Sequence, residues 1–128
     1  KQLEQEAVER LVEASRAGDL VTLREEIETY PNIVNKYDDW KRTALTQATQ
    51  FRRLKAIKML VEAKANPNLP DKQRRFEMTA LLYAVQSDKS LPIVIYLIQE
   101  AKADATLEDG RSGNALAYAQ MNQATEVE

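Results

Sequence analysis

The chain of 128 residues contains no cysteine and no histidine, and it has only 3 glycines and 4 prolines. Without cysteine there is no disulfide, thiol nucleophile or thiolate metal site, and without histidine the commonest general base and metal ligand are missing. Most hydrolase triads and soft-metal sites are therefore excluded. We expect a non-enzymatic chain with no cofactor and no small-molecule substrate. The lack of cysteine fits a reducing compartment but does not prove one, since many secreted proteins also lack cysteine. We expect a cytoplasmic or nuclear location, or a host cell if the chain is a bacterial effector.

Long apolar runs are missing too. None approaches the roughly 18 residues of a membrane-spanning helix, so we expect no membrane contact. The balance of 18 basic and 20 acidic residues gives a net charge of −2, which offers no overall attraction to nucleic acid. The sequence begins at Lys1 rather than methionine and carries no signal peptide, so we expect a fragment or a processed product.

One motif returns about every 35 residues. It reads T-A-L-T-Q-A at 43–48, T-A-L-L-Y-A at 79–84 and N-A-L-A-Y-A at 114–119, with offsets of 79 − 43 = 36 and 114 − 79 = 35. A period of this length is typical of proteins built from stacked supersecondary units.

Apolar periodicity predicts pairs of helices joined by tight corners and separated by extended fingers. Leu3, Ala7, Leu11 and Ala14 form one stripe, for example, and Gly18 can end that helix in a left-handed conformation. The helices are predicted at 3–16, 20–28, 43–51, 54–63, 79–86, 92–98 and 114–121, and the fingers at 33–42, 71–78 and 109–113. Neither helix of a pair could bury its apolar face alone, so the pairs must stack.

These features resemble the ankyrin repeat family, whose unit has about 33 residues and a T-P-L-H-x-A signature. The best segment is 43–68, where E-A-K-A-N-P-N at 62–68 is similar to the family's E-A-G-A-D-x-N ending. E-A-K-A-D at 100–104 repeats that ending, and D-D-W-K-R-T at 38–43 is similar to the D-x-x-G-x-T finger.

The resemblance implies an all-α ankyrin-repeat solenoid that forms a single domain over residues 1–128. Repeat 1 would span about 3–35, repeat 2 about 36–69, repeat 3 about 70–105 and a partial repeat 4 about 106–128. Because the fourth repeat lacks its second helix, we expect the intact protein to continue past Glu128. Lys64 and Lys102 replace the family's glycine; if they are left-handed, each costs roughly 1 kcal/mol.

The resemblance also implies a function. In ankyrin proteins the finger tips and the exposed side of each first helix line one concave groove that binds proteins. The residues carried over to that groove are Asp39, Trp40, Arg42, Gln50, Phe51, Arg75, Phe76, Met78, Gln86, Ser87 and Arg111. We expect a protein or peptide partner of acidic character, because Arg75 would bind a carboxylate through two hydrogen bonds, and we expect a monomer.

Trp40 is the sharpest of these candidates, because it is the only tryptophan and lies off the core stripes. It is either a binding hot spot or a ring folded back on Tyr37 or the next finger. Tyr83 and Tyr118 hold equivalent positions, for which packing between repeats is favoured over ligand binding.

Carboxylates are candidates for chemistry at two places. Asp38 and Asp39 could serve as an acid–base pair, but a solvated turn is the favoured interpretation because neighbours in an extended turn point apart. Asp104, Glu108 and Asp109 could bind a hard cation, yet they lack calcium-loop spacing, so solvated loop charges are favoured.

Basic residues cluster at 52–58 and at 72–75. The first cluster is either a solvated helix face, which we favour, or a phosphate site. The second lies beside Phe76, so nucleic-acid binding at 72–76 is a minority hypothesis. A further alternative is a targeting or regulatory module of a larger enzyme, such as a bacterial effector that acts on host proteins.

Overall fold

The computed structural model describes residues 2–73, 77–86 and 91–107. These residues form six α-helices and no strand. The helices are α1 (Gln2–Ala17), α2 (Leu20–Thr29), α3 (Ala44–Gln50), α4 (Leu54–Glu62), α5 (Ala80–Val85) and α6 (Leu91–Gln99). The predicted all-α class is therefore confirmed over this part of the chain. The helix predicted at 114–121 and the finger predicted at 109–113 lie outside the described residues.

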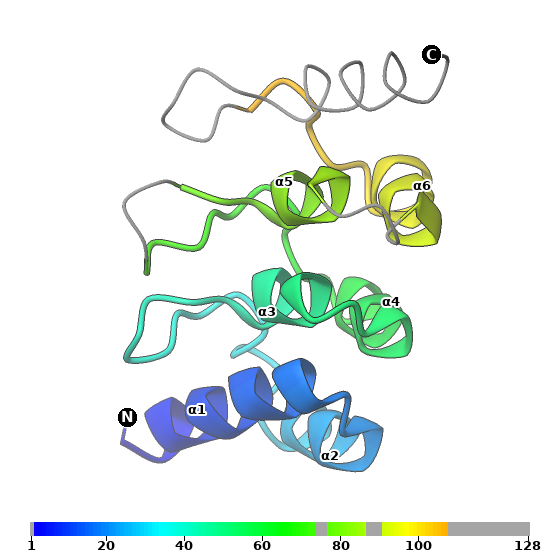
Figure 1. The fold of residues 1–128 in the computed structure, drawn as a ribbon. Coiled ribbons are helices and arrows are strands. Elements are labelled where there is room, and N and C mark those ends of the chain that lie inside the picture. The colour runs from blue at the N-terminus through cyan, green and yellow to red at the C-terminus, as the bar shows by residue number, and fades with distance from the viewer. Residues whose placement is uncertain (1, 74–76, 87–90, 108–128) are drawn as a thin grey trace, which may run out of the picture.

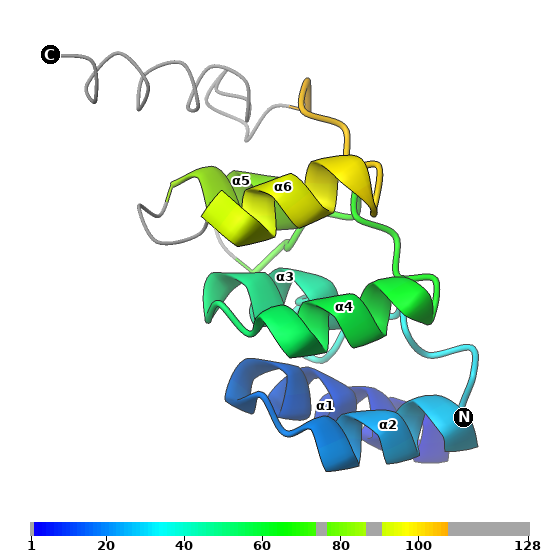
Figure 2. The ribbon, with the colours of Figure 1, turned by 90° about the vertical axis from the view of Figure 1, so that its right-hand side faces the viewer.

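The helices form three pairs stacked one above another (Figure 1). One column contains α1, α3 and α5, which we call the inner helices, and the other contains α2, α4 and α6 (Figure 2). Two segments that we call the first finger (residues 36–42) and the second finger (described residues 71–73 and 77–78) project on the same side, next to the inner helices (Figure 1). This arrangement agrees with the helix, corner, helix and finger order predicted from the sequence.

Side-chain caps start the helices where the sequence predicts them. The Thr43 hydroxyl accepts a bond from the Thr46 backbone N–H at 3.1 Å, and Thr79 does the same for Leu82 at 3.3 Å. Asp19 accepts from the Thr22 N–H at 3.2 Å at the start of α2. Each cap satisfies a backbone donor that has no partner inside the helix.

Left-handed backbone follows the ends of four helices. The φ angles are +74° at Gly18, +58° at Arg52, +74° at Lys64 and +59° at Lys102, and Lys41 in the first finger has +61°. Lys64 and Lys102, which stand where the ankyrin pattern has glycine, are thus left-handed, at a cost of about 1 kcal/mol each relative to glycine. A cation just past a helix C-terminus interacts favourably with the helix dipole, which offsets part of this cost.

One continuous core runs through the stack. Its largest fully buried side chains come from all three pairs, among them Leu11, Leu23, Ile57, Leu60 and Leu97. Burying each such side chain is worth roughly 1.5–3 kcal/mol. The stack therefore supplies the burial that a single helix pair could not.

Asparagines also link the loops of successive repeats. The side-chain oxygen of Asn35 accepts from the Asn66 backbone N–H at 2.7 Å, and the side-chain oxygen of Asn68 accepts from the Asp104 N–H at 2.8 Å. Asn35 and Asn68 lie 68 − 35 = 33 residues apart. These bonds fix the vertical register of the repeats and hence the positions of the fingers.

Candidate protein-binding surface

The first finger is closed by a buried ion pair. Asp38 accepts from the Arg42 Nε at 2.8 Å, from the Arg42 backbone N–H at 2.8 Å and from the Trp40 N–H at 3.0 Å. The Asp38 side chain is 0% exposed, so the prediction of a solvated turn is wrong for this residue. Its carboxylate is occupied by Arg42 and serves to shape the finger, which also argues against an acid–base pair with Asp39.

The tip of this finger is anchored on α1. The Asp39 N–H donates to the Glu9 carboxylate at 2.9 Å, and the Gln5 amide donates to the Asp39 carboxylate at 3.3 Å. Asp39 itself is exposed. The backbone before Trp40 is therefore held by its contacts with α1. The Asp38–Arg42 pair closes the finger on both sides of Trp40.

Trp40 is 64% exposed at the tip of the first finger. Its ring is not folded back on Tyr37, whose own ring lies 5.3 Å from the Lys72 ammonium and whose hydroxyl donates to the Pro70 carbonyl at 2.7 Å. An exposed tryptophan on a fixed backbone is typical of binding hot spots.

The second finger is held by Asp71, which is 1% exposed. Its backbone N–H donates to the Met78 carbonyl at 2.8 Å, and the Lys72 N–H donates to the Lys41 carbonyl of the first finger at 2.8 Å. The Asp71 carboxylate accepts from the Gln47 amide and the Tyr83 hydroxyl, both at 2.9 Å. The finger is thereby attached to two inner helices, and Tyr83 has a linking role within the stack.

Arg16 completes this set of contacts at the other end of α3. It donates through Nη1 to the Gln47 Oε1 at 2.7 Å, and its guanidinium carbon lies 4.5 Å from the centroid of the Phe51 ring. We call the linked side chains Arg16, Gln47, Asp71 and Tyr83 the polar chain, because they connect the three inner helices α1, α3 and α5. Sequence reasoning did not identify the polar chain. The one available signal was that Gln47 and Tyr83 occupy equivalent positions, 83 − 47 = 36 residues apart.

The eleven residues predicted to bind a partner fall into three groups. Those open to solvent or partly so are Asp39, Trp40, Gln50, Phe51 and Gln86. Two are buried, at 9% for Arg42 and 6% for Met78. The structure therefore corrects both: Arg42 is paired with Asp38, and Met78 packs in the core where its backbone bonds Asp71. Those outside the described residues are Arg75, Phe76, Ser87 and Arg111.

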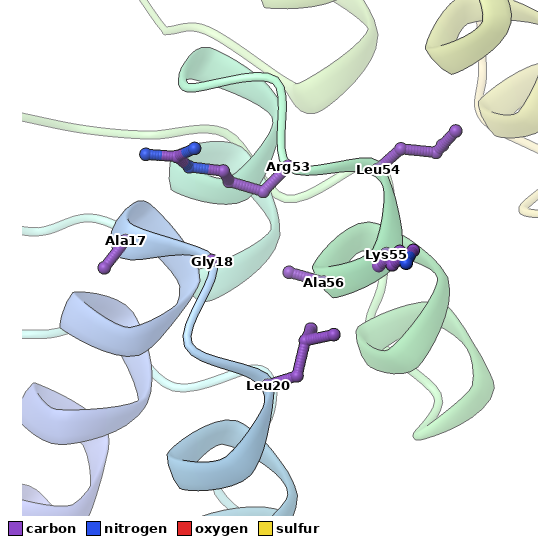
Figure 3. Close-up of a pocket in the computed structure, with 7 residues that line it drawn as sticks. All are labelled: Ala17, Gly18, Leu20, Arg53, Leu54, Lys55 and Ala56. Carbon is purple, nitrogen blue, oxygen red and sulfur yellow. The ribbon is translucent and has the colours of Figure 1, made fainter.

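The basic cluster at 52–58 does not converge on one point. A hollow of about 220 Å³ lies between the corner at Gly18 and the start of α4, but only Arg53 and Lys55 of the cluster line it (Figure 3). Arg53 runs back over the end of α1 and donates to the Arg16 carbonyl at 2.9 Å. The Lys58 ammonium lies 5.7 Å from the Tyr96 ring on the outer column. A solvated helix face, the favoured interpretation, describes this cluster better than a phosphate site.

Asp104 is occupied locally. Its carboxylate accepts from the Thr106 hydroxyl at 2.6 Å and the Thr106 N–H at 2.9 Å, and these bonds hold its pKa below the ordinary value. Glu108 and Asp109, its candidate partners in a cation site, lie outside the described residues. Across residues 2–73, 77–86 and 91–107, no group of three acidic side chains is arranged to hold a metal ion.

Fold and site together define a helical repeat protein that presents fingers and inner helices on one side. Residues 40–72 match the model of the ankyrin repeat family. The match covers the tip of the first finger, α3, α4 and the start of the second finger, and it confirms the resemblance predicted from the sequence. Ankyrin repeats are non-catalytic modules that bind proteins. A search of curated proteins found no match to the chain. No helix in the described part of the chain is long and apolar enough to cross a membrane.

Proposed function

We propose that the chain is a recognition module that binds a protein or peptide in the groove between its fingers and its inner helices. The observation that carries this proposal is Trp40, a large apolar ring with 64% exposure on a finger whose backbone is fixed. Tryptophan is enriched among residues that dominate binding energy. A surface that is already ordered also loses little conformational entropy when a partner binds.

The groove adds a second contact region at the C-terminal end of α3. Phe51 is 40% exposed there, and Gln50 is half-buried beside it. Gln86 is exposed at the equivalent end of α5. A partner would therefore meet an aromatic ring at the finger tip and a second one near the corners, where the glutamines end α3 and α5.

Substitution of Trp40 tests the proposal. Partners are captured with the wild-type chain and their affinities are measured for Trp40→Ala and for Val21→Ala. Val21 is the matched control, because it is an apolar side chain with 67% exposure on α2, away from the fingers. We expect at least about a tenfold loss of affinity for Trp40→Ala, the scale of a hot spot, and no change for Val21→Ala. Unchanged binding by a folded Trp40→Ala variant would contradict the proposal.

A targeting role within a larger enzyme would use the same groove. The full reading frame separates that role from a scaffold: a catalytic motif elsewhere in the frame supports targeting, whereas further repeats alone support the scaffold.

A further inference from the structure

We propose that Arg16 is an anchor of the groove and binds a side-chain carboxylate of an acidic peptide partner. This inference rests on the proposed function, since it assigns a partner chemistry to the same groove. Arg16 stands near the C-terminal end of α1, where the inner helices turn into their corners. It was not among the residues predicted from the sequence.

The guanidinium of Arg16 is held in place before any partner arrives. The Phe51 ring lies under it at 4.5 Å, and the Gln47 oxygen accepts from Nη1 at 2.7 Å. The Glu13 carboxylate lies 3.7 Å from its Nε. The Arg16 side chain nevertheless remains 29% exposed, so a partner can reach it. A long side chain that is already oriented loses less entropy when it binds than a free one.

The orientation of Gln47 is itself determined by the structure. Gln47 is fully buried and contacts Asp71 on one side and Arg16 on the other. A carboxylate only accepts hydrogen bonds and a guanidinium only donates them, so the Gln47 NH₂ must face Asp71 and its oxygen must face Arg16. Asp71 belongs to the second finger. The position of Arg16 in repeat 1 thus depends on a buried residue two repeats away.

Arginine keeps donors for a ligand in this arrangement. Its guanidinium has five N–H groups in a planar fork, and that fork matches the two oxygens of a carboxylate. Nη1 bonds Gln47 and Nε faces Glu13, while no described residue accepts a bond from Nη2. The donors left for a ligand are therefore the two N–H groups of Nη2.

The local charge favours an anion. Arg52 and Arg53 follow Phe51 directly in the sequence and are both exposed. The carboxylate beside Arg16 is that of Glu13, which Arg42 also approaches to 3.8 Å. Arg53 also covers the C-terminal end of α1, where the helix dipole is negative, by donating to the Arg16 carbonyl (Figure 3). Basic side chains therefore outnumber acidic ones around Arg16, in contrast to the finger tip, where Asp39 and Glu9 lie close to Trp40.

A random peptide library, displayed and selected against the full chain, tests the assignment without knowledge of the natural partner. We expect the wild type to enrich peptides with Asp or Glu at a constant distance from an apolar residue. A selected peptide is then resynthesised with Gln for Glu (or Asn for Asp). The amide peptide should bind the wild type about 10- to 100-fold more weakly, the range for a hydrogen bond to a charged group.

Variants of the chain identify the residue responsible. Arg16→Gln should bind the acidic and amide peptides equally, and Arg16→Lys, which keeps the charge but not the fork, should recover only part of the difference. Arg24→Gln is the matched control, because Arg24 is exposed on α2 away from the groove, and it should behave as wild type. Helix content by circular dichroism confirms folding. If Arg16→Gln does not fold, the comparison of the two peptides on wild type and Arg16→Lys still decides the question.

Each outcome separates this inference from the proposed function. Selected peptides that depend on Trp40 but show no acidic preference would overturn the role of Arg16 and leave the recognition module standing. A phosphoserine peptide that binds where its glutamate counterpart does not would overturn the carboxylate assignment. Failure to select any peptide whose binding depends on Trp40 would contradict both the role of Arg16 and the proposed function.

Discussion

Removing the hydroxyl of Tyr83 is expected to destabilise the fold chiefly through its bond to Asp71. Tyr83 donates to the Asp71 carboxylate at 2.9 Å, and that carboxylate is 1% exposed, so water cannot replace the lost donor. A hydrogen bond to a charged group contributes about 1.5–3 kcal/mol, compared with about 0.5–1.5 kcal/mol for a neutral pair. We therefore expect Tyr83→Phe to lower the free energy of unfolding by about 2 kcal/mol.

A double-mutant cycle isolates this bond. Asp71→Asn keeps the shape of the side chain and removes its charge, so Tyr83→Phe should cost only about 1 kcal/mol in that background. Tyr37→Phe is the matched control: its hydroxyl donates to the neutral Pro70 carbonyl at 2.7 Å. Its cost should be the same, about 1 kcal/mol, with either residue at position 71.

Urea unfolding followed by circular dichroism at 222 nm measures each free energy. Trp40 fluorescence is a poor probe, because the ring is 64% exposed in the folded state and its surroundings change little on unfolding. An equal cost of Tyr83→Phe in the wild-type chain and in the Asp71→Asn variant would refute the reasoning, since the hydroxyl would then gain nothing from the charge of the carboxylate.

Three further predictions concern the backbone and one cap. Lys64→Gly should raise the free energy of unfolding by about 0.5–1 kcal/mol, because glycine removes left-handed strain at some entropic cost. Lys64→Ala should not raise the free energy of unfolding, and urea unfolding measures both variants. Gly18→Ala should lower the free energy of unfolding by about 1–2 kcal/mol or more, since the φ of +74° is strained for alanine and the new Cβ would lie 3.1 Å from the Arg53 Cδ. A Gly18→Ala variant as stable as wild type would contradict this. Hydrogen bonds from the Thr22 hydroxyl and N–H hold the pKa of Asp19 below its ordinary value. The stability that the ionised Asp19 cap contributes is therefore fully present above the ordinary aspartate pKa, and it is lost as the pH falls through the lowered pKa of the folded state. The stability difference between wild type and Asp19→Asn should thus stay constant above about pH 5 and shrink below about pH 4, and a difference unaffected by acid would show that the cap does not titrate.

Most of the stack follows from local chemistry that the sequence displays. Thr43 and Thr79 start helices because a hydroxyl there satisfies a backbone N–H three residues on, a relation that involves only neighbours. Lys64 and Lys102 stand where the ankyrin pattern has glycine, which raised the question of a left-handed backbone at both positions, and both are left-handed. Such features depend on spacing within one repeat and are readable before any tertiary contact is known.

Roles that depend on how a finger folds on itself were not readable in the same way. Arg42 was placed on the binding surface because it lies in a finger, yet Asp38 four residues earlier holds it below the surface. Met78 was assigned to the groove by position, but the bridge to Asp71 turns it into the core. Buried and exposed side chains alternate within a finger over one or two positions. An alignment to the family pattern that is wrong by one residue therefore assigns a buried residue to the exposed surface.

Arg16 and Arg42 show why residue type alone could not locate the anchor of the groove. Both are arginines within reach of Glu13, at 3.7 Å and 3.8 Å, and both belong to the groove side of the first two repeats. Arg42 meets a buried carboxylate in its own finger, and its charge is used to build the surface. Arg16 is oriented by a neutral amide and an aromatic ring, and its one carboxylate neighbour, Glu13, lies 3.7 Å away with a side chain that is 70% exposed. The difference arises from Gln47, since an acidic residue at that buried position would neutralise Arg16 and leave nothing for a partner. In the proposed binding mode, recognition by Arg16 would therefore depend on Gln47, a fully buried residue that no partner would touch.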